Sequence, residues 1–321
     1  MLGRGAELKA PLERALALAA GTSEREKSHV AIFAKILTGQ GVAAIPLVLE
    51  HTRTWPRDAM VLAPITGVFG LIAFSGKAGR EAEQLAVLQP LASAYGDDWW
   101  FRMVFAFAQI ELQDFTNGLR NIETALHGNP RNGHAAHIRG HLYYELGERR
   151  EGLQFLSQWA KDYPKDAHIH CHISGHQAIW SLETGRREDA WSIYLRDLHP
   201  GGSWGPRSTF SPIAPHFSRE RRWPGKRSIR SSGGRSAHMR RNGFQTRGSP
   251  LPILHSALAF AMSGDSDALR SLVDNPKGPA ADILAPITRG FDAFARQRWN
   301  EAVQELQPVL LMHERVGGSR G

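Results

Sequence analysis

The sequence contains one cysteine and no long apolar run, and both shortages exclude classes of protein. Because Cys171 stands alone among 321 residues, an internal disulfide framework and a zinc site made only of cysteine are excluded. The longest apolar run, residues 63–74, is interrupted by one proline and two glycines and is too short to cross a bilayer. The N-terminus shows no signal-peptide pattern. We therefore expect a cytoplasmic protein without a membrane segment.

Catalytic signatures are also lacking. The chain has no GxGxxG segment after a strand, no Walker sequence and no HExxH pair. The glycine-rich segment GGSWGP at 201–206 is not followed by GK[ST], so we interpret it as a tight loop. From these patterns we expect no enzyme activity and no cofactor.

Acidic residues are scarce in one window, and this scarcity accounts for the basic character of the whole chain. Lys and Arg total 39 against 31 Asp and Glu, which gives a net charge of +8. Residues 206–250 hold eleven basic residues and one acid, Glu220, so this window carries +10 and the remainder of the chain −2. We therefore do not expect the rest of the chain to bind nucleic acid through its net charge.

Arg, Ser, Pro and Gly dominate residues 206–250 and no helical apolar period continues through them, so we predict that this window is disordered. Three interpretations stay open: a basic arm that binds the phosphate backbone of nucleic acid, an inert flexible insertion, and a locally shifted reading frame. The abrupt change of composition favours the shifted frame. The predicted organisation is a helical array at 1–205, the basic segment at 206–250 and a C-terminal helical repeat at 251–321.

A repeated spacing of turn, small and proline residues runs through the rest of the chain. Pro56, Pro130 and Pro164 each follow a polar turn residue by 17 positions. The turn residues are Gly39, Gln113 and Gly147, with less complete equivalents at Gly185 and Gln297. Small residues recur five positions after these turns and seven before them, which lets two helices approach closely. A proline at a fixed place ends the second helix.

Apolar residues between the turns recur at three- and four-residue spacing, as in 136–146, and two-residue alternation is rare. A pair of short amphipathic helices cannot bury its apolar face alone, so neighbouring pairs must stack. We therefore predict an all-α fold, an α-solenoid of stacked helical hairpins.

The 34 residues from Pro130 to Pro164 and the terminal proline resemble the tetratricopeptide repeat, best in LGERREGLQFLSQWAKDYP at 146–164. Longer segments are similar to the tetratricopeptide repeat protein 38 family. They are HTRTWPRDAMVLAPITGVFGLIAFSG (51–76), YGDDWWF (95–101), NPRNGHAAHIRGHLYYELGE (129–148), DLHPGGSWGP (197–206) and LHSALAFAMSGD (254–265). Members of that family begin earlier and continue past the GGSR segment, so the resemblance implies a chain shortened at both ends. It also implies a soluble helical-repeat protein with no established catalytic activity.

The resemblance further implies that the first helix of each hairpin lines a concave groove, with contacts 13, 10, 6 and two to three positions before the turn residue. These spacings lie on one helical stripe. We expect such a groove to bind an extended peptide or protein partner. The predicted groove residues are Trp100, Met103, Phe107, Glu111, His134, His137, His141, Tyr144, Glu145, His172 and Glu183.

Histidine is dense in the middle of this predicted groove, where seven of the chain's 15 lie between His134 and His176. His172 and His176 have the four-residue spacing at which two imidazoles on one helix can share a metal ion. The candidates for metal ligands are His137, His141, His172 and His176. A second interpretation, which the sequence favours, is that these histidines are polar packing residues. A third is acid–base chemistry by a His–Glu pair such as His141 with Glu145.

The sequence therefore predicts a non-catalytic helical-repeat scaffold that binds a peptide or protein partner in its groove. The alternatives are a metal-dependent or His/Glu acid–base enzyme in the same groove, and nucleic-acid binding through residues 206–250. Neither the partner's identity nor the oligomeric state follows from these patterns.

Overall fold

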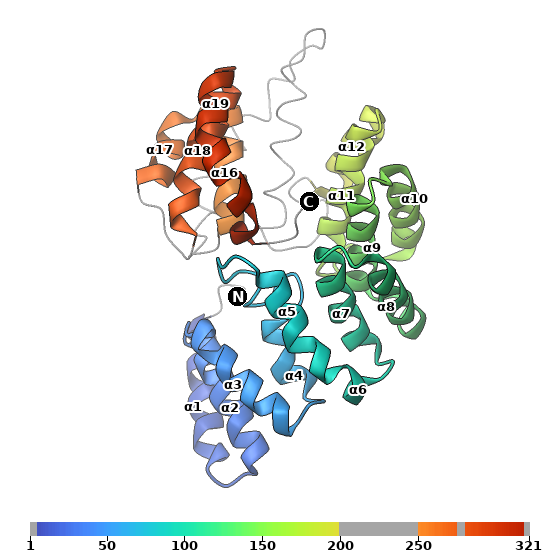
Figure 1. Cartoon of the computed structure of the whole chain (residues 1–321), viewed down its shortest axis with the longest axis vertical. Helices are drawn as coiled ribbons and strands as arrows, with labels where there is room; N and C mark the ends of the chain where they lie inside the picture. The colour runs from blue at the N-terminus through green and yellow to red at the C-terminus, as the bar shows by residue number, and fades with distance from the viewer. Residues whose placement is uncertain (1–4, 199–249, 275–279, 318–321) are drawn as a thin grey trace. The chain divides into compact units, whose positions relative to one another are not determined.

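The computed structural model describes residues 5–198, 250–274 and 280–317, and every regular element in these ranges is a helix (Figure 1). The all-α prediction is confirmed for this part of the chain. No helix within the same ranges is both long and apolar enough to cross a membrane. The window at 206–250, with its predicted disorder, lies outside the described residues.

Contacts divide the chain into two compact units. The first comprises residues 1–75 and 79–130, and the second comprises 76–78 and 131–321. The division falls at Pro130, inside the array that the sequence predicted for 1–205. The predicted limits at 205 and 251 stay predictions, because they flank the window that is not described.

The helices of both units are short. Those of the first unit are α1 (Lys9–Ala19), α2 (Glu24–Leu37), α3 (Gly41–Thr54), α4 (Ala59–Leu62), α5 (Arg80–Leu88), α6 (Ala92–Tyr95), α7 (Trp99–Glu111) and α8 (Phe115–Gly128). Those of the second are α9 (Gly133–Glu145), α10 (Arg149–Trp159), α11 (His170–Glu183), α12 (Arg187–Ile193), α16 (Pro250–Ser263), α17 (Ser266–Asp274), α18 (Ala281–Ala295) and α19 (Trp299–Leu306). Turns of 3-10 helix lie at Gly5–Leu8, Ala63–Ile65, Gln89–Leu91, Ala160–Asp162 and Gln307–Val316, and a π-helical turn lies at Tyr194–Leu198.

Consecutive helices pack as hairpins: α2–α3, α7–α8, α9–α10, α11–α12, α16–α17 and α18–α19. The residue at each hairpin turn has a left-handed backbone. The φ angles are 83° at Gly39, 64° at Gln113, 76° at Gly147, 79° at Gly185, 74° at Gly264 and 61° at Gln297. All five turn residues that the sequence predicted therefore adopt the same unusual conformation.

Each of these turns closes with the same two backbone hydrogen bonds. At the α9–α10 turn, the Gly147 N–H donates to the Tyr144 carbonyl at 3.0 Å and the Glu148 N–H donates to the Tyr143 carbonyl at 2.9 Å. Equivalent pairs occur at the other five turns. This is the Schellman motif, which satisfies the last carbonyls of a helix and stops it.

The small residues predicted five positions after the turns lie where helices cross. Ala44, Gly118, Gly152, Ala190 and Ala302 are all buried. A Cβ atom at Gly118 would lie 2.6 Å from the Ile110 side chain, and one at Gly152 would lie 2.8 Å from the Trp180 ring. A larger side chain would therefore force these helices apart.

The period is interrupted between α4 and α5, where residues 66–79 form turns instead of a helix. Val68, Ile72 and Ala73 in this stretch are buried in the first unit. The apolar run at 63–74 therefore contributes side chains to the core of the first unit, although most of this run is not helical.

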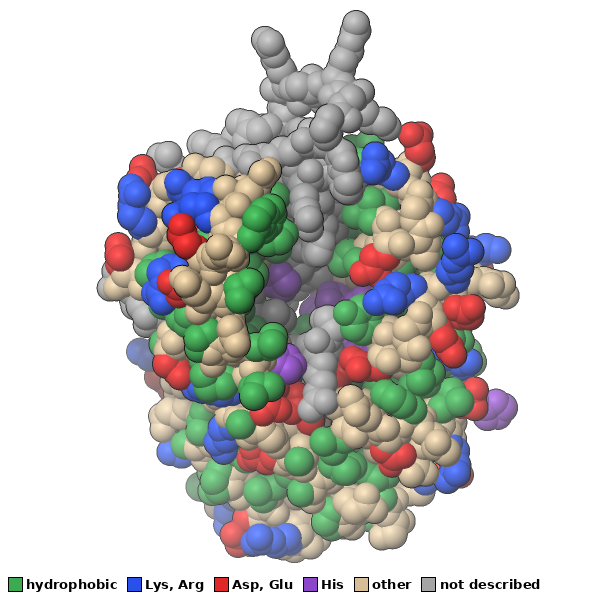
Figure 2. Space-filling model, turned by 45° about the horizontal axis from the view of Figure 1, so that its top comes forward, with side chains coloured by type: hydrophobic (Ala, Val, Ile, Leu, Met, Phe, Trp, Pro, Cys, Tyr) green, Lys and Arg blue, Asp and Glu red, His purple; other side chains and the backbone are tan. Residues whose placement is uncertain are grey.

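Charged side chains of both signs are interspersed over the visible face of the described residues (Figure 2). Ion pairs among the described residues include Arg289 with Glu305 at 2.8 Å and Arg296 with Asp292 at 2.9 Å. This mixture agrees with the small net charge calculated for the chain outside residues 206–250.

Candidate functional site

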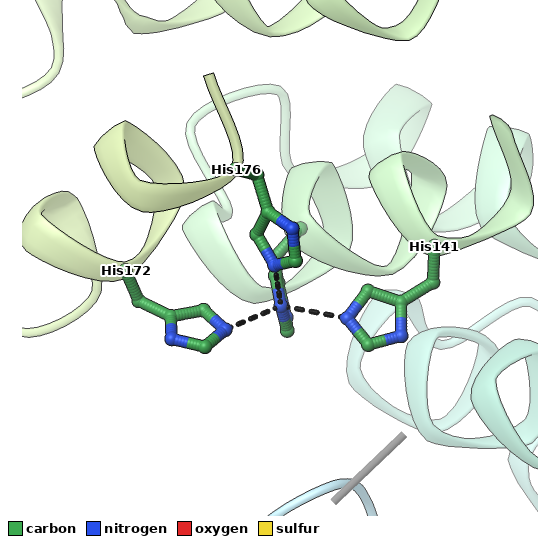
Figure 3. Close-up of side chains that lie close together, drawn as sticks. His141, His172 and His176 are labelled. Atoms are coloured by element: carbon green, nitrogen blue, oxygen red, sulfur yellow. Dashed lines mark hydrogen bonds between the residues drawn. The ribbon is translucent and has the colours of Figure 1, made fainter. Parts of the chain in front are cut away.

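Helices α9 and α11 bring four histidines together. His137 and His141 lie four residues apart on α9, and His172 and His176 lie four residues apart on α11, so each pair projects from one face of its helix. Figure 3 shows His141, His172 and His176 pointing toward one place, where the dashed lines meet. We call these four residues the histidine cluster; they are the four that the sequence indicated as metal candidates.

The start of α9 is set by Asn132, whose side-chain oxygen accepts hydrogen bonds from the backbone N–H groups of His134 and Ala135 at 3.1 and 3.2 Å. The direction of α11 is set by its apolar residues. Ile173 and Trp180 pack with residues of α10, and Cys171 packs with residues of α12. The face of α11 that carries His172 and His176 is thereby left for α9.

The Nε2 atom of His137 lies at the centre of the cluster. It is 2.8 Å from Nε2 of His141, 2.8 Å from Nε2 of His172 and 3.0 Å from Nε2 of His176. One imidazole nitrogen carries either one proton or one lone pair, so it forms one ordinary hydrogen bond. At most one of the three contacts can therefore be a hydrogen bond, and hydrogen bonding alone does not explain why the nitrogens converge.

Burial keeps three of these imidazoles neutral at pH 7. His137 is fully buried, and His172 and His176 are half-buried. Burial, reinforced by repulsion between neighbouring imidazolium charges, lowers the pKa of His137 and of His176 well below the usual value and that of His172 to about 3. A neutral imidazole has the free lone pair that a metal ion binds.

The donor set limits which ions fit. Four imidazole nitrogens suit borderline cations such as Zn²⁺, whereas Mg²⁺ and Ca²⁺ prefer oxygen. Cys171 is turned away into an apolar cluster with Ala178, Ala190 and Leu198, and the His170 ring stacks on Tyr163. These two neighbouring donors are therefore outside the cluster.

The other predicted groove residues of α9 and α11 remain partly accessible. His134 and Glu145 are half-buried, and the His134 ring lies 6.2 Å from that of His168. Burial and then the charge of His168 lower the pKa of His134.

Tyr144 and Glu183 are joined through one arginine. The Arg149 guanidinium lies 5.7 Å from the centre of the half-buried Tyr144 ring, and its Nε is 2.8 Å from the carboxylate of the exposed Glu183. An aromatic ring and carboxylates are thus accessible on consecutive first helices of the second unit.

In the first unit, α7 carries Trp100, Met103, Phe107 and Glu111. Trp100 is half-buried with its ring 5.9 Å from that of Tyr95, and the other three are buried. The sequence predicted these three, like His137 and His141, to line an open groove. A partner would reach them only if their surroundings opened.

A polar network that no spacing in the sequence indicated joins α2, α3 and the start of α4. The Asp58 carboxylate accepts a hydrogen bond from Arg25 Nε at 3.0 Å and lies 3.0 Å from His51 Nε2, while His51 Nδ1 lies 2.9 Å from Ser28 Oγ. Burial alone would raise the pKa of Asp58, but the hydrogen bonds from His51 and Arg25 outweigh it and lower the pKa. The only sequence signal was the HTRTWPRD segment, which holds both His51 and Asp58.

Comparisons with known proteins give a partial likeness. No protein-family model matches the chain. Protein CTR9 homolog of Arabidopsis thaliana is 28% identical over 113 residues, which are 35% of this chain and 10% of that protein. The chain therefore spans about a tenth of the length of this curated relative. The likeness is compatible with a helical repeat and lends no support to the tetratricopeptide repeat protein 38 family in particular.

Proposed function

We propose that the chain is a non-catalytic helical-repeat scaffold of tetratricopeptide type, which binds an extended peptide segment of a protein partner along the first helices of its hairpins. The observation that carries this proposal is the shared construction of the hairpins, whose six turns have the same left-handed residue and the same hydrogen bonds. Stacked units of this kind present extended concave surfaces for binding. The partial likeness to Protein CTR9 homolog and the motifs resembling the tetratricopeptide repeat protein 38 family support the same class.

The accessible part of the predicted groove in the second unit favours a basic peptide. Tyr144 carries an aromatic ring with a polar tip, and Glu145 and Glu183 carry carboxylates on α9 and α11. A cation of the peptide would take the place of Arg149, which lies over the ring and pairs with Glu183. An extended basic segment would pair its charges with these carboxylates and pack an apolar side chain on the ring. The Nε2 atoms of the histidine cluster converge on one another, so we assign the cluster no part in holding the peptide.

Selection from a display library of short random peptides on the intact chain tests the proposal. We expect enrichment of peptides that carry basic residues beside an apolar anchor. A Glu145→Gln/Glu183→Gln variant should bind the enriched peptides about tenfold more weakly, which corresponds to about 1.4 kcal/mol. Fluorescence anisotropy of labelled peptides measures the affinity.

The matched control is Glu151→Gln/Glu188→Gln, which removes two exposed carboxylates from the second helices of the same hairpins. This variant should bind as the parent does. Equal weakening by both double variants would show attraction to net charge alone, and a library without enriched peptides would contradict the proposal outright.

A further inference from the structure

The geometry points to a zinc site in the histidine cluster, with one Zn²⁺ bound by the Nε2 atoms of His137, His141, His172 and His176. The ion cross-links α9 to α11 and thereby fastens two consecutive hairpins, α9–α10 and α11–α12. This inference goes beyond peptide binding, and neither of the two proposals requires the other.

The spacing of the four nitrogens is close to what a tetrahedral ion imposes. Zinc–nitrogen bonds of about 2.0–2.1 Å hold neighbouring ligand atoms about 3.4 Å apart. Three nitrogens lie 2.8–3.0 Å from His137 Nε2, and the ligand atoms of all four residues lie within 4.8 Å of one another. Binding of the ion would require the imidazoles to rotate about their side-chain torsions until these distances are equal.

The central ring explains why the cluster requires an ion. His137 is fully buried, its Nδ1 has no hydrogen-bond partner among the described residues, and its Nε2 faces three nitrogens. Burying a polar ring in this state is costly, because a buried polar atom without a partner loses its bond to water. A divalent cation accepts one lone pair from each of the four Nε2 atoms at once, which removes the conflict at His137 Nε2.

The number and type of ligands assign the ion a structural role. Four protein ligands close a tetrahedral shell, whereas a catalytic zinc ion keeps one position for water or substrate. The four ligands come in two pairs from two helices, and 35 residues separate His137 from His172. The ion therefore constrains the packing of two hairpins that are also joined by a chain segment, by apolar contacts and by polar contacts such as that of Arg149 with Glu183.

Metal analysis of the tag-free chain tests the inference, since a polyhistidine tag would bind zinc itself. The protein is stripped with a chelator, reloaded with Zn²⁺ and dialysed. Elemental mass spectrometry then measures the number of zinc ions per chain. We expect one zinc per chain in the parent, loss of it in His137→Ala and in His176→Ala, and full retention in His134→Ala. His134 lies on the same helix but outside the cluster, so it is the matched control.

Two further measurements keep the test decisive where a variant is destabilised. Titration of the stripped parent with Co²⁺ should give the intense visible bands of tetrahedral cobalt, and added Zn²⁺ should abolish them. Zn²⁺ but not Mg²⁺ should raise the thermal midpoint of the stripped parent and leave that of His176→Gln unchanged. A reloaded parent with far less than one zinc per chain, or equal zinc in His134→Ala and His176→Ala, overturns the site.

Discussion

At the scale of single residues, the buried imidazoles couple folding to pH. In the unfolded chain a histidine titrates near pH 6.5, whereas burial lowers the folded pKa of His137 and His176 well below that value and that of His172 to about 3. Below pH 6.5 the unfolded chain therefore binds protons that the folded chain does not. These rings therefore leave the free energy of unfolding independent of pH above 6.5 and lower it increasingly as the pH falls below that value.

We expect the free energy of unfolding of the chelator-stripped protein to fall by about 1.4 kcal/mol per pH unit below pH 6.5 for His137 alone. Urea unfolding across this range measures the slope. His137→Gln should make the slope shallower by about 1.4 kcal/mol per pH unit, because His172 and His176 still contribute. His168→Gln, which changes an exposed imidazole, should keep a slope close to that of the parent. An unchanged slope in His137→Gln would show that this ring is not the source.

Sequence spacing was informative about single residues only where they share a helix. The four-residue separation within each histidine pair predicts a common face, and the structure has both pairs on such faces. The histidine face of α9 meets the histidine face of α11 only because α11 packs on α10 in a particular orientation. Contacts such as that of the Trp180 ring with Gly152 set this orientation. The Asp58 network had no spacing to reveal it, because its members come from different helices and a turn.

At the scale of helices and turns, the left-handed turn residues make separate contributions to stability. A residue with a Cβ atom in this conformation costs about 1–2 kcal/mol, and Gln113 has φ 64°. We expect Gln113→Gly to raise the free energy of unfolding by about 0.5–1 kcal/mol, since glycine's greater freedom in the unfolded chain offsets part of the gain. Gly147→Ala should lower it by about 1–2 kcal/mol.

The control for this pair is Gly21→Ala. An added Cβ meets nothing within 4 Å at Gly21 or at Gly147, but only Gly147 has a positive φ. Gly21→Ala should therefore change stability by no more than about 0.5 kcal/mol. Urea unfolding of the three variants checks this, and equal effects at Gly21 and Gly147 would contradict a backbone origin.

The hairpin turns were predictable because each turn depends on the type of residue at one position in the sequence. A helix that ends in a Schellman motif needs a residue tolerant of positive φ at one position, and that requirement repeats with the hairpin. The irregular segment at 66–79 was not predictable in the same way, since its apolar residues have no helical period and are held by burial in the first unit.

At the scale of the whole molecule, apolar side chains remain exposed near the last described residues. Trp299, Val303, Leu310 and Leu311 are 54%, 58%, 65% and 90% exposed. Exposed apolar side chains that lie close together promote association, and Leu310 and Leu311 are adjacent in the sequence. We expect the apparent mass in analytical ultracentrifugation to rise with protein concentration, and Leu310→Ser/Leu311→Ser to suppress this rise.

Leu16→Ser is the control for that variant, because Leu16 is 48% exposed on α1, far from Leu310 and Leu311 in the sequence. It should leave the concentration dependence unchanged. A parent that stays at one mass over the whole range would contradict the expectation.

Five of the described hairpin turns could be predicted from the sequence, whereas the division of the chain into two units could not. The repeat predicts one array at 1–205, but contacts separate residues 1–130 from the remainder, apart from the short 76–78 segment. A sequence period indicates that hairpins recur. It does not indicate which neighbouring hairpins pack most closely. The window at 206–250 has no period at all, so its three interpretations stay predictions.

The two histidine pairs of the cluster occupy different positions within their repeats. His137 and His141 lie ten and six residues before Gly147, whereas His172 and His176 lie thirteen and nine residues before Gly185. Copying one hairpin in tandem would not create a second such set. A copy inserted between α10 and α11 would separate the two pairs. If the ion is needed, gene duplication can therefore add hairpins elsewhere in the array but not at this junction.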